Sequence, residues 1–373
     1  MKAALVLLAA CSFAHGTNGT AGSDGGGRDA PGDTVVDGRP DAAPNCYGSG
    51  LVTICAQLPV PATWDVTAPA TIDTGMDAQC DFIADEPSGA LCVKQAQNVT
   101  LSDSLGLDGT RGLVILATDS LTIASTGSID ASSFGGDNGP GANPGSCTAG
   151  TPAGSDNGNG QHNGGGGGAG GSYGGTGGNG SDGAKSGATA GPTLVATAVV
   201  GGCPGSAGGN GDSPHLGGTA GAGGGAVYLI AGNSIAISGA INASGAPGLG
   251  GDLRSGGGGG GAGGLIGLDA PTVQVTASAQ VFANGGGGGE GGDTTDPGFD
   301  GGASLSPDVA GLGGLGNSAG GDGGDGAAGT VLGGGSGAAR VDNAGGGGGG
   351  GAGIVKVFAA HPEIAGAISP PPS

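Results

Sequence analysis

Short runs of alternating apolar and small or polar residues recur along this chain, and long glycine-rich tracts separate them. The alternation is clearest in residues 225–244, GAVYLIAGNSIAISGAINAS, for example at Ile235-Ala236-Ile237. A period of two predicts a strand with one buried face, and the branched aliphatic residues also favour strand. The four copies are RGLVILATDSLTIASTGSIDAS from Arg111, GAVYLIAGNSIAISGAINAS from Gly225, GLIGLDAPTVQVTASAQVFANG from Gly264 and GIVKVFAAHPEIAGAIS from Gly353.

Aligning the four copies predicts three columns of inward-facing residues. A weaker fifth copy lies at residues 99–107. The predicted columns are Leu116, Ile230, Leu268 and Val357; then Ile123, Ile237, Val275 and Ile364; then Ile129, Ile241, Val281 and Ile368.

One copy contains too few apolar side chains to fold alone, so the copies are expected to stack on one another. This predicts an all-β protein, an irregular parallel β-helix or solenoid-like stack of short strands with long glycine-rich insertions. A sandwich of β-hairpins is the structural alternative. It would need tight two-residue turns after each strand, whereas the copies show corner-like breaks such as Gly232-Asn233 and Ser238-Gly239-Ala240.

The glycine tracts admit two interpretations. Glycine recurs at every third position in two stretches, a period that suits extended, polyproline-II-like helices of three residues per turn whose bare face lets neighbouring chains approach closely. Mobile loops are the alternative, because glycine loses much conformational entropy when it is fixed. The period-three positions are Gly165, Gly168, Gly171, Gly174, Gly177, Gly180 and Gly183, and again Gly320, Gly323, Gly326 and Gly329.

Composition limits both the core and the partners. The 373 residues include 100 glycines but only one Trp, three Tyr and six Phe, so the core must be thin. Thirty acidic residues against nine basic ones give a net charge of -21, which would repel phosphate backbones and excludes nucleic acid as a natural partner.

The N-terminal sequence MKAALVLLAACS resembles a bacterial lipoprotein signal peptide, since Leu8-Ala9-Ala10-Cys11 fits its lipobox. The resemblance implies removal of residues 1–10, lipidation of the Cys11 thiol and anchoring to a membrane. Ser12 is not the Asp that retains many such proteins at the inner membrane, which suggests the outer membrane or cell surface. An ordinary secretory signal with an incidental cysteine is the alternative.

Six further cysteines in an exported chain predict disulfides. Proximity along the sequence favours the pairs Cys46–Cys55, Cys80–Cys92 and Cys147–Cys203, although other connectivities are open. A zinc site is disfavoured because the chain has no CxxC motif with a neighbouring histidine.

The predicted domain order follows from these features. Residues 11–45, rich in Gly, Asp and Pro, form a flexible tether. Residues 46–108 form a small disulfide-containing β cap, and residues 109–373 form the glycine-rich β-repeat domain.

The tracts GGGGGAGGSYGGTGGNG and GGGGGGAGG resemble the glycine-rich portion of PE-PGRS proteins over roughly residues 110–360. The helical PE domain of that family is missing, and a lipobox stands in its place. The resemblance implies a glycine-rich bacterial surface lipoprotein.

Two segments fit the calcium-binding nonapeptide GGxGxDxUx: GGDGGDGAA from Gly320 and GGEGGDTTD from Gly288. Their candidate ligands are Asp322, Asp325, Asp293 and Asp296. The large apolar position of the motif is occupied by Ala327 and Thr295, and the two segments are not in tandem, so Asp serving only to solvate the loops is the competing interpretation.

No catalytic constellation stands out. The acidic residues in the copies do not share an aligned position, which argues against the paired carboxylates of a glycan-cleaving enzyme. We therefore expect a non-enzymatic, lipid-anchored surface protein of structural or adhesin-like type, without a cofactor, whose partners are the membrane and an extracellular matrix or glycan. The alternative is a calcium- or glycan-binding module that uses its Asp-rich glycine loops. The acidic residues concerned are Asp119, Asp130, Asp269 and Glu363.

Overall fold

A computed structural model describes residues 45–148, 150–155, 164–316, 319–340 and 343–373. These residues belong to one compact unit. Their regular structure is nearly all β, with strands β1 to β18 and one short 3-10 helix, η1 (Asp77–Gln79). The predicted signal peptide, Cys11 and almost all of the predicted tether lie outside the described residues.

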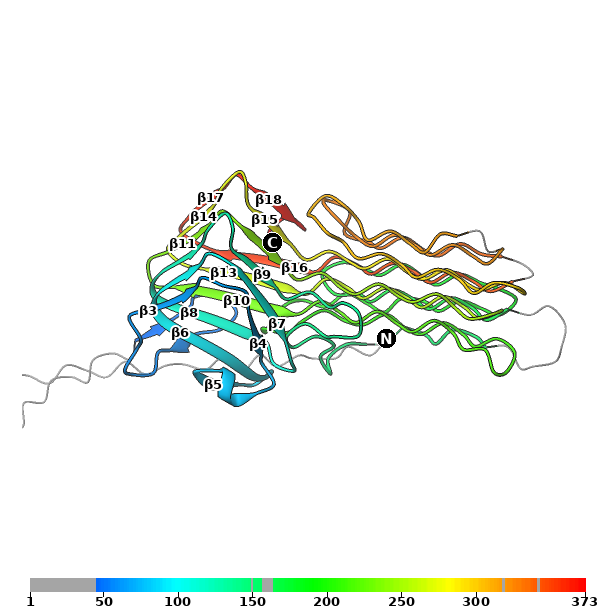
Figure 1. Ribbon diagram of the computed structural model, residues 1–373, viewed down its shortest axis with the longest axis horizontal. Coiled ribbons are helices and arrows are strands. Elements are labelled where there is room, and N and C mark those ends of the chain that lie inside the picture. Colours follow the sequence, from blue (N-terminus) through cyan, green and yellow to red (C-terminus); the bar gives the residue numbers. More distant parts are fainter. Residues whose placement is uncertain (1–44, 149, 156–163, 317–318, 341–342) are drawn as a thin grey trace, which may run out of the picture. The chain divides into compact units, whose positions relative to one another are not determined.

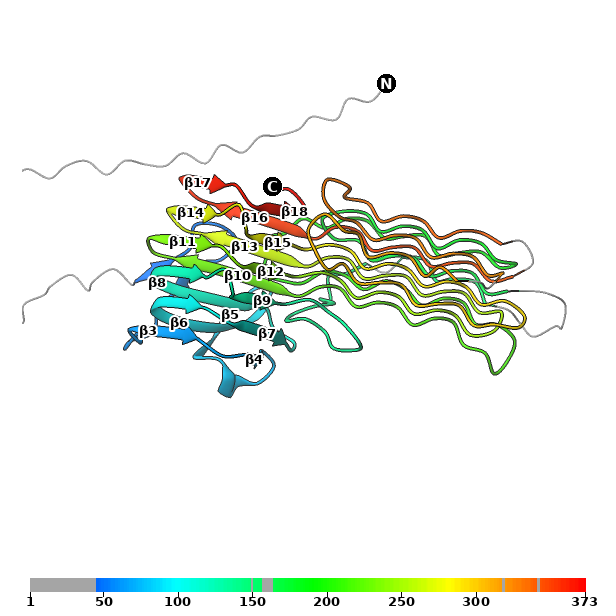
Figure 2. The ribbon, with the colours of Figure 1, turned by 45° about the horizontal axis from the view of Figure 1, so that its top comes forward.

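Strands from successive sequence copies lie side by side in parallel (Figures 1 and 2). Each of β10, β11 and β12 pairs on one side with the strand of the preceding copy and on the other with the strand of the following copy. The copies contribute β8 (Leu113–Ile123) and β9 (Ser128–Asp130); β10 (Ala226–Ala231), β11 (Ser234–Ile237) and β12 (Ala240–Asn242); β13 (Leu265–Asp269), β14 (Thr272–Val275) and β15 (Gln280–Phe282); and β16 (Ile354–Phe358), β17 (His361–Ile364) and β18 (Ala367–Ser369).

The segment predicted as a separate cap continues these same ladders. Strand β6 pairs in parallel with β8, and β7 pairs in parallel with β9, as expected for the weaker fifth copy. Strands β3 and β4 add one further layer, while β5 on β6 and β1 on β2 are antiparallel. These strands are β1 (Cys46–Tyr47), β2 (Ile54–Cys55), β3 (Thr63–Val66), β4 (Ala70–Asp73), β5 (Phe82–Glu86), β6 (Gly89–Leu101) and β7 (Ser104–Asp108).

The register confirms the alignment of two of the three predicted columns, although Ile364, which was predicted to face inward, is 40% exposed. Ile237 pairs with Ile123 and Val275, and Val275 pairs with Ile364. Ile241 pairs with Ile129 and Val281, and Val281 pairs with Ile368.

The first predicted column is wrong by one residue in two copies. Leu229 pairs with Ile115 and Leu268, whereas Ile230 pairs with Leu116 and Asp269. The reason is that every residue of β10 is buried, so both faces of this strand carry apolar side chains and the period of two cannot show which face points inward.

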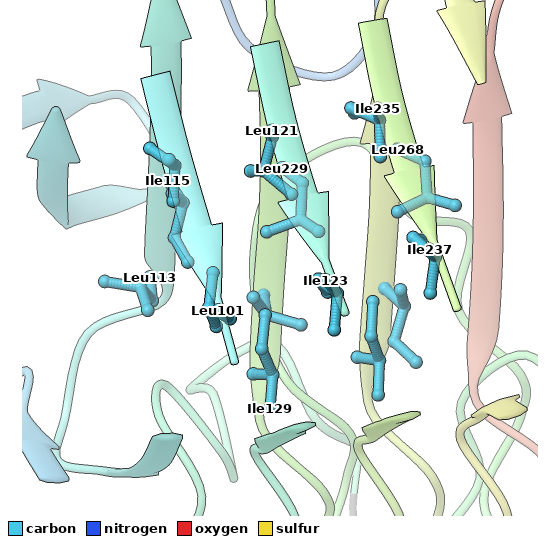
Figure 3. Packing of buried hydrophobic residues seen from close by; sticks show 14 of the residues in the cluster. Leu101, Leu113, Ile115, Leu121, Ile123, Ile129, Leu229, Ile235, Ile237 and Leu268 are labelled. Atoms are coloured by element: carbon cyan, nitrogen blue, oxygen red, sulfur yellow. The ribbon is translucent and has the colours of Figure 1, made fainter. Parts of the chain in front are cut away.

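The core accordingly consists of two apolar clusters. The inner cluster lies within the stacked strands and contains Leu229, Ile235 and Ile237 (Figure 3). The outer cluster contains Leu116, Tyr228 and Ile230 and covers the opposite face of the large sheet. The thin core expected from the composition is therefore thickened by a second layer.

The glycine tracts are packed against one another through backbone hydrogen bonds of period three. In residues 256–264, every third N–H group bonds to the same neighbouring tract, and the three sets bond to residues 203–209, 345–351 and 243–249. The carbonyl groups of residues 256–262 accept bonds from residues 168–171, 218–224 and 286–289. This central tract thus has six hydrogen-bonded neighbours, and the tracts run side by side in both ribbon views (Figures 1 and 2). We call this assembly of tracts, residues 164–225, 243–264 and 283–353 where described, the glycine bundle.

The three disulfides are those predicted from sequence proximity, Cys46–Cys55, Cys80–Cys92 and Cys147–Cys203. The first closes the β1–β2 hairpin, and the third ties the segment after β9 to the glycine bundle. In the described part of the chain, no helix has the length and apolar character required to cross a membrane.

Candidate functional site

A two-glycine turn follows the last strand of the first copy and presents an aromatic ring beside a carboxylate. Gly135 and Gly136 have φ values of 60° and 99°, the left-handed backbone that a tight type I′ turn requires and that glycine adopts without steric cost. Phe134 and Asp137 exchange both backbone hydrogen bonds across it, at 3.1 and 3.0 Å between N and O. Residues that pair directly in this way project their side chains to the same face.

The base of this turn is fixed to the glycine bundle by Ser133, whose side chain is buried. The Ser133 hydroxyl donates a 2.5 Å hydrogen bond to the Gly223 carbonyl and accepts a 2.8 Å bond from the N–H of Gly139. The Asn143 side-chain oxygen accepts a 2.8 Å bond from the N–H of Gly223. Because these partners belong to packed backbone, the turn has a fixed position relative to the bundle.

The turn forms one wall of a groove of about 630 Å³, which we call the turn groove. Tracts of the glycine bundle also line it and contribute Leu249, Pro204 and Pro247. Polar side chains stand around it, among them Asp300, whose Oδ1 accepts a 2.8 Å hydrogen bond from the N–H of Gly250. The side chains that line the groove are those of Phe134, Asp137, Asn138, Asn143, Pro204, Thr219, Ala220, Ala222, Ala246, Pro247, Leu249 and Asp300.

A second groove, of about 660 Å³, shares Asp137 with the turn groove and is also acidic. Asp73, Asp108 and Asp137 line it together with Arg111. The pKa of Asp108 is raised, first by burial and then by the negative charges of Asp73 and Asp137. The guanidinium of Arg111 is held by the Asp77 carboxylate at 2.7 Å, so the groove as a whole disfavours anionic ligands.

The Asp residues predicted as calcium ligands do not form a cluster. Among the residues that the structure describes, no group of three or more His, Cys, Asp or Glu side chains is arranged to hold a metal ion. The Asp325 side chain instead accepts a 2.8 Å hydrogen bond from the N–H of Gly313. Asp296 accepts a 2.9 Å bond from the Thr295 hydroxyl, which also bonds to Asp293 at 3.0 Å, so these two carboxylates share one turn.

Asp293 is a structural turn carboxylate, because its oxygens are engaged by backbone. Oδ1 accepts bonds from the N–H groups of Thr295 and Asp296 and from the Thr295 hydroxyl, and Oδ2 accepts one from the N–H of Ala319. Burial acts to raise the pKa of Asp293, but these hydrogen bonds together outweigh it and lower the pKa to about 2.

A pH-dependent contribution to stability follows from Asp293. A carboxyl whose pKa falls from 3.8 in the unfolded chain to about 2 in the folded protein stabilises the fold fully above pH 4, and the contribution of about 2 kcal/mol is lost as the pH falls towards 2. We expect Asp293→Ala to be less stable than the wild type at pH 6 and to show a smaller loss of stability between pH 4 and pH 2. Urea unfolding at several pH values measures the free energy of unfolding. The same loss between pH 4 and pH 2 in the variant and the wild type would contradict the assignment to Asp293.

The acidic residues of the strand copies have separate structural surroundings. Asp269 is buried and accepts bonds from the N–H groups of Ser49 and Gly50 at 2.8 Å and from the Tyr228 hydroxyl at 3.0 Å. It therefore fixes the β1–β2 hairpin onto the large sheet. Glu363 accepts a 3.0 Å bond from the Gln274 side chain, and Asp130 accepts one from the Ser132 hydroxyl.

Sequence reasoning did not identify Phe134 or the turn groove. Phe134 lies outside the period-two alternation and belongs to no strand. The signal that was present is the pair Gly135-Gly136 between an aromatic residue and an aspartate, which is typical of a tight turn.

The chain matches no protein-family model, no curated protein and no solved structure.

Proposed function

We propose that this protein is a non-enzymatic, lipid-anchored cell-surface protein of structural or adhesin-like type. The observation that carries the proposal is the packing of the glycine bundle, in which each tract is held by backbone hydrogen bonds to several others. A protease can bind a tract only after that tract has separated from its hydrogen-bonded neighbours. The packed bundle is therefore expected to resist proteolysis. The chain's net charge of -21 keeps the surface solvated.

Two finer assignments of the fold belong to this proposal. We class the stacked strands as an irregular parallel β-helix, supported by the parallel ladders that join each copy to the next. We class the glycine bundle as polyglycine-II-like, supported by the period of three in its hydrogen bonds.

The lipid anchor is supported by the lipobox Leu8-Ala9-Ala10-Cys11. Metabolic labelling of producing cells with radioactive palmitate tests the anchor. We expect label in the wild type and none in Cys11→Ala, and an unlabelled wild type would remove the anchor from the proposal.

The adhesive role is tested on the cell surface. Intact cells that display the protein are treated with a protease and assayed for attachment to matrix-coated beads. We expect the folded part to be accessible to antibody, to survive digestion and to increase attachment over cells that lack the protein. Unchanged attachment would contradict the role.

A glycan-binding module is the second candidate function, and the turn groove favours it. The calcium-binding version has less support, because the carboxylate of Asp293 is engaged by backbone donors and the four predicted ligands do not converge.

A further inference from the structure

We propose that the turn groove binds a saccharide chain that carries no acidic groups. This inference rests on the proposed surface role and specifies the class of ligand that the surface would recognise. The groove, of about 630 Å³, is within the range of sites that hold small ligands.

Phe134 supplies a platform for a sugar ring. Its side chain is 64% exposed although the chain has few aromatic residues to place in its core. The face of an aromatic ring carries partial negative charge and attracts polarised C–H groups, such as those on one face of a pyranose. Leu249, Pro204 and Pro247 add further apolar surface to the lining of the groove.

Hydroxyl groups of the sugar would find polar partners among the other residues that line the groove. Asp137, Asn138 and Asn143 lie at the turn, and Thr219 and Asp300 lie on the bundle. A ligand with many hydroxyls and with C–H faces suits a groove in which carboxylate and amide groups surround an apolar platform. A purely apolar ligand would displace water from these polar groups without giving them hydrogen bonds in return.

The charges around the groove select against acidic sugars. Asp137 and Asp300 contribute negative charge, Asp137 also lines the neighbouring acidic groove, and the whole chain carries a net charge of -21. Uronic acids and sulfated sugars would be repelled, while neutral sugars would be tolerated and amino sugars attracted.

The turn is pre-organised for binding. Its two mutual backbone bonds and the two bonds of the buried Ser133 hydroxyl fix its backbone before any ligand arrives. Less conformational entropy is therefore lost on binding than with a mobile loop.

The test is calorimetric titration of the full chain with three probes: cellotetraose, the tetramer of β-1,4-linked glucosamine, and tetragalacturonate. We expect binding of the first two, with the glucosamine tetramer tighter and sensitive to salt, and no binding of the third. Phe134→Ala is expected to weaken binding about tenfold, while Phe134→Trp retains it.

Leu216→Ala is the matched control, since Leu216 is 65% exposed and does not line the turn groove. It should leave affinity unchanged, and thermal melts should show that the variants are folded. Asp137→Asn combined with Asp300→Asn should reduce the preference for glucosamine over cellotetraose.

Three outcomes would overturn the proposal: no heat with either non-acidic probe at about 10 mM, equal affinity of wild type and Phe134→Ala, or tightest binding of tetragalacturonate. These outcomes are distinct from failure of the surface role. Absence of palmitate on Cys11, or unchanged attachment of cells, would contradict the surface role but not a measured saccharide affinity. Absence of saccharide binding would contradict the ligand proposal but not the anchor or the packing of the glycine bundle.

Discussion

Replacing Gly259 by alanine is expected to lower the free energy of unfolding by about 2 kcal/mol or more. Gly259 lies in the central tract of the glycine bundle, where its N–H donates to the Ser206 carbonyl at 2.9 Å and its carbonyl accepts from the N–H of Gly221 at 2.8 Å. A Cβ at this position would overlap the carbonyl oxygen of Ala169. Because the obstructing atom belongs to backbone that is itself hydrogen-bonded, no flexible side chain can move aside.

Valine at the same position should lower the free energy of unfolding more than alanine does, since two more methyl groups would have to enter the same space. Gly145→Ala is the matched control, because a Cβ on Gly145 would meet nothing within 4 Å. We expect this control to change stability by less than about 0.5 kcal/mol. Urea unfolding measures all three variants. Equal stability of Gly259→Ala and the control would show that the central tracts do not pack as described.

Removing the disulfide between Cys147 and Cys203 is expected to cost about 4 kcal/mol, the second large effect. The bond closes a loop with a sequence separation of 56, and in the chain-entropy description the stabilisation grows with the length of the closed loop. The double variant Cys147→Ser with Cys203→Ser should therefore melt at a clearly lower temperature than the wild type.

The disulfide between Cys46 and Cys55 provides the comparison, because its sequence separation is only 9 and the same description gives about 3 kcal/mol. Thermal unfolding of the two double serine variants ranks them. A larger fall in melting temperature on removing Cys46–Cys55 than on removing Cys147–Cys203 would contradict the entropic explanation. A wild-type melting temperature in Cys147→Ser with Cys203→Ser would show that the bundle needs no such link.

Where apolar and polar residues alternate, the sequence was sufficient to predict strand register. In strands β11 and β12 the buried residues Ile235, Ile237 and Ile241 alternate with half-buried ones, so only one face can be the buried one. Their pairing partners in the neighbouring copies are the residues aligned from sequence. The alignment of residues 99–107 as a further copy is confirmed for the same reason, since Leu101 pairs with Ile123 and Leu105 with Ile129.

Where both faces of a strand are buried, sequence periodicity could not fix the register. Strand β10 packs the inner cluster with Leu229 and the outer cluster with Tyr228 and Ile230. The outer cluster exists because residues distant in sequence, such as Ile54 and Tyr173, cover that face. No local pattern contains this information.

The candidate site was out of reach for a related reason. Phe134 becomes a candidate ligand platform only because the tracts that hold Leu249 and Pro247 pass beside it. Those contacts join segments more than 100 residues apart in a chain whose insertions have unequal lengths. The sequence could predict a turn at Gly135-Gly136 but not what lies opposite it.

The sequence by itself predicted the β character of the chain, the stacking of its copies and the favoured pairing of its cysteines, because alternation, repetition and proximity are local properties. A sandwich of hairpins and other cysteine connectivities were excluded only by the tertiary structure. The sequence also left open whether the glycine tracts are packed or mobile. Only the tertiary structure decided this, since a single glycine tract has no side chains to bury and acquires order from the N–H and carbonyl groups of its neighbours. A group of such tracts satisfies its backbone collectively, and that collective property cannot be assigned to any one stretch of sequence.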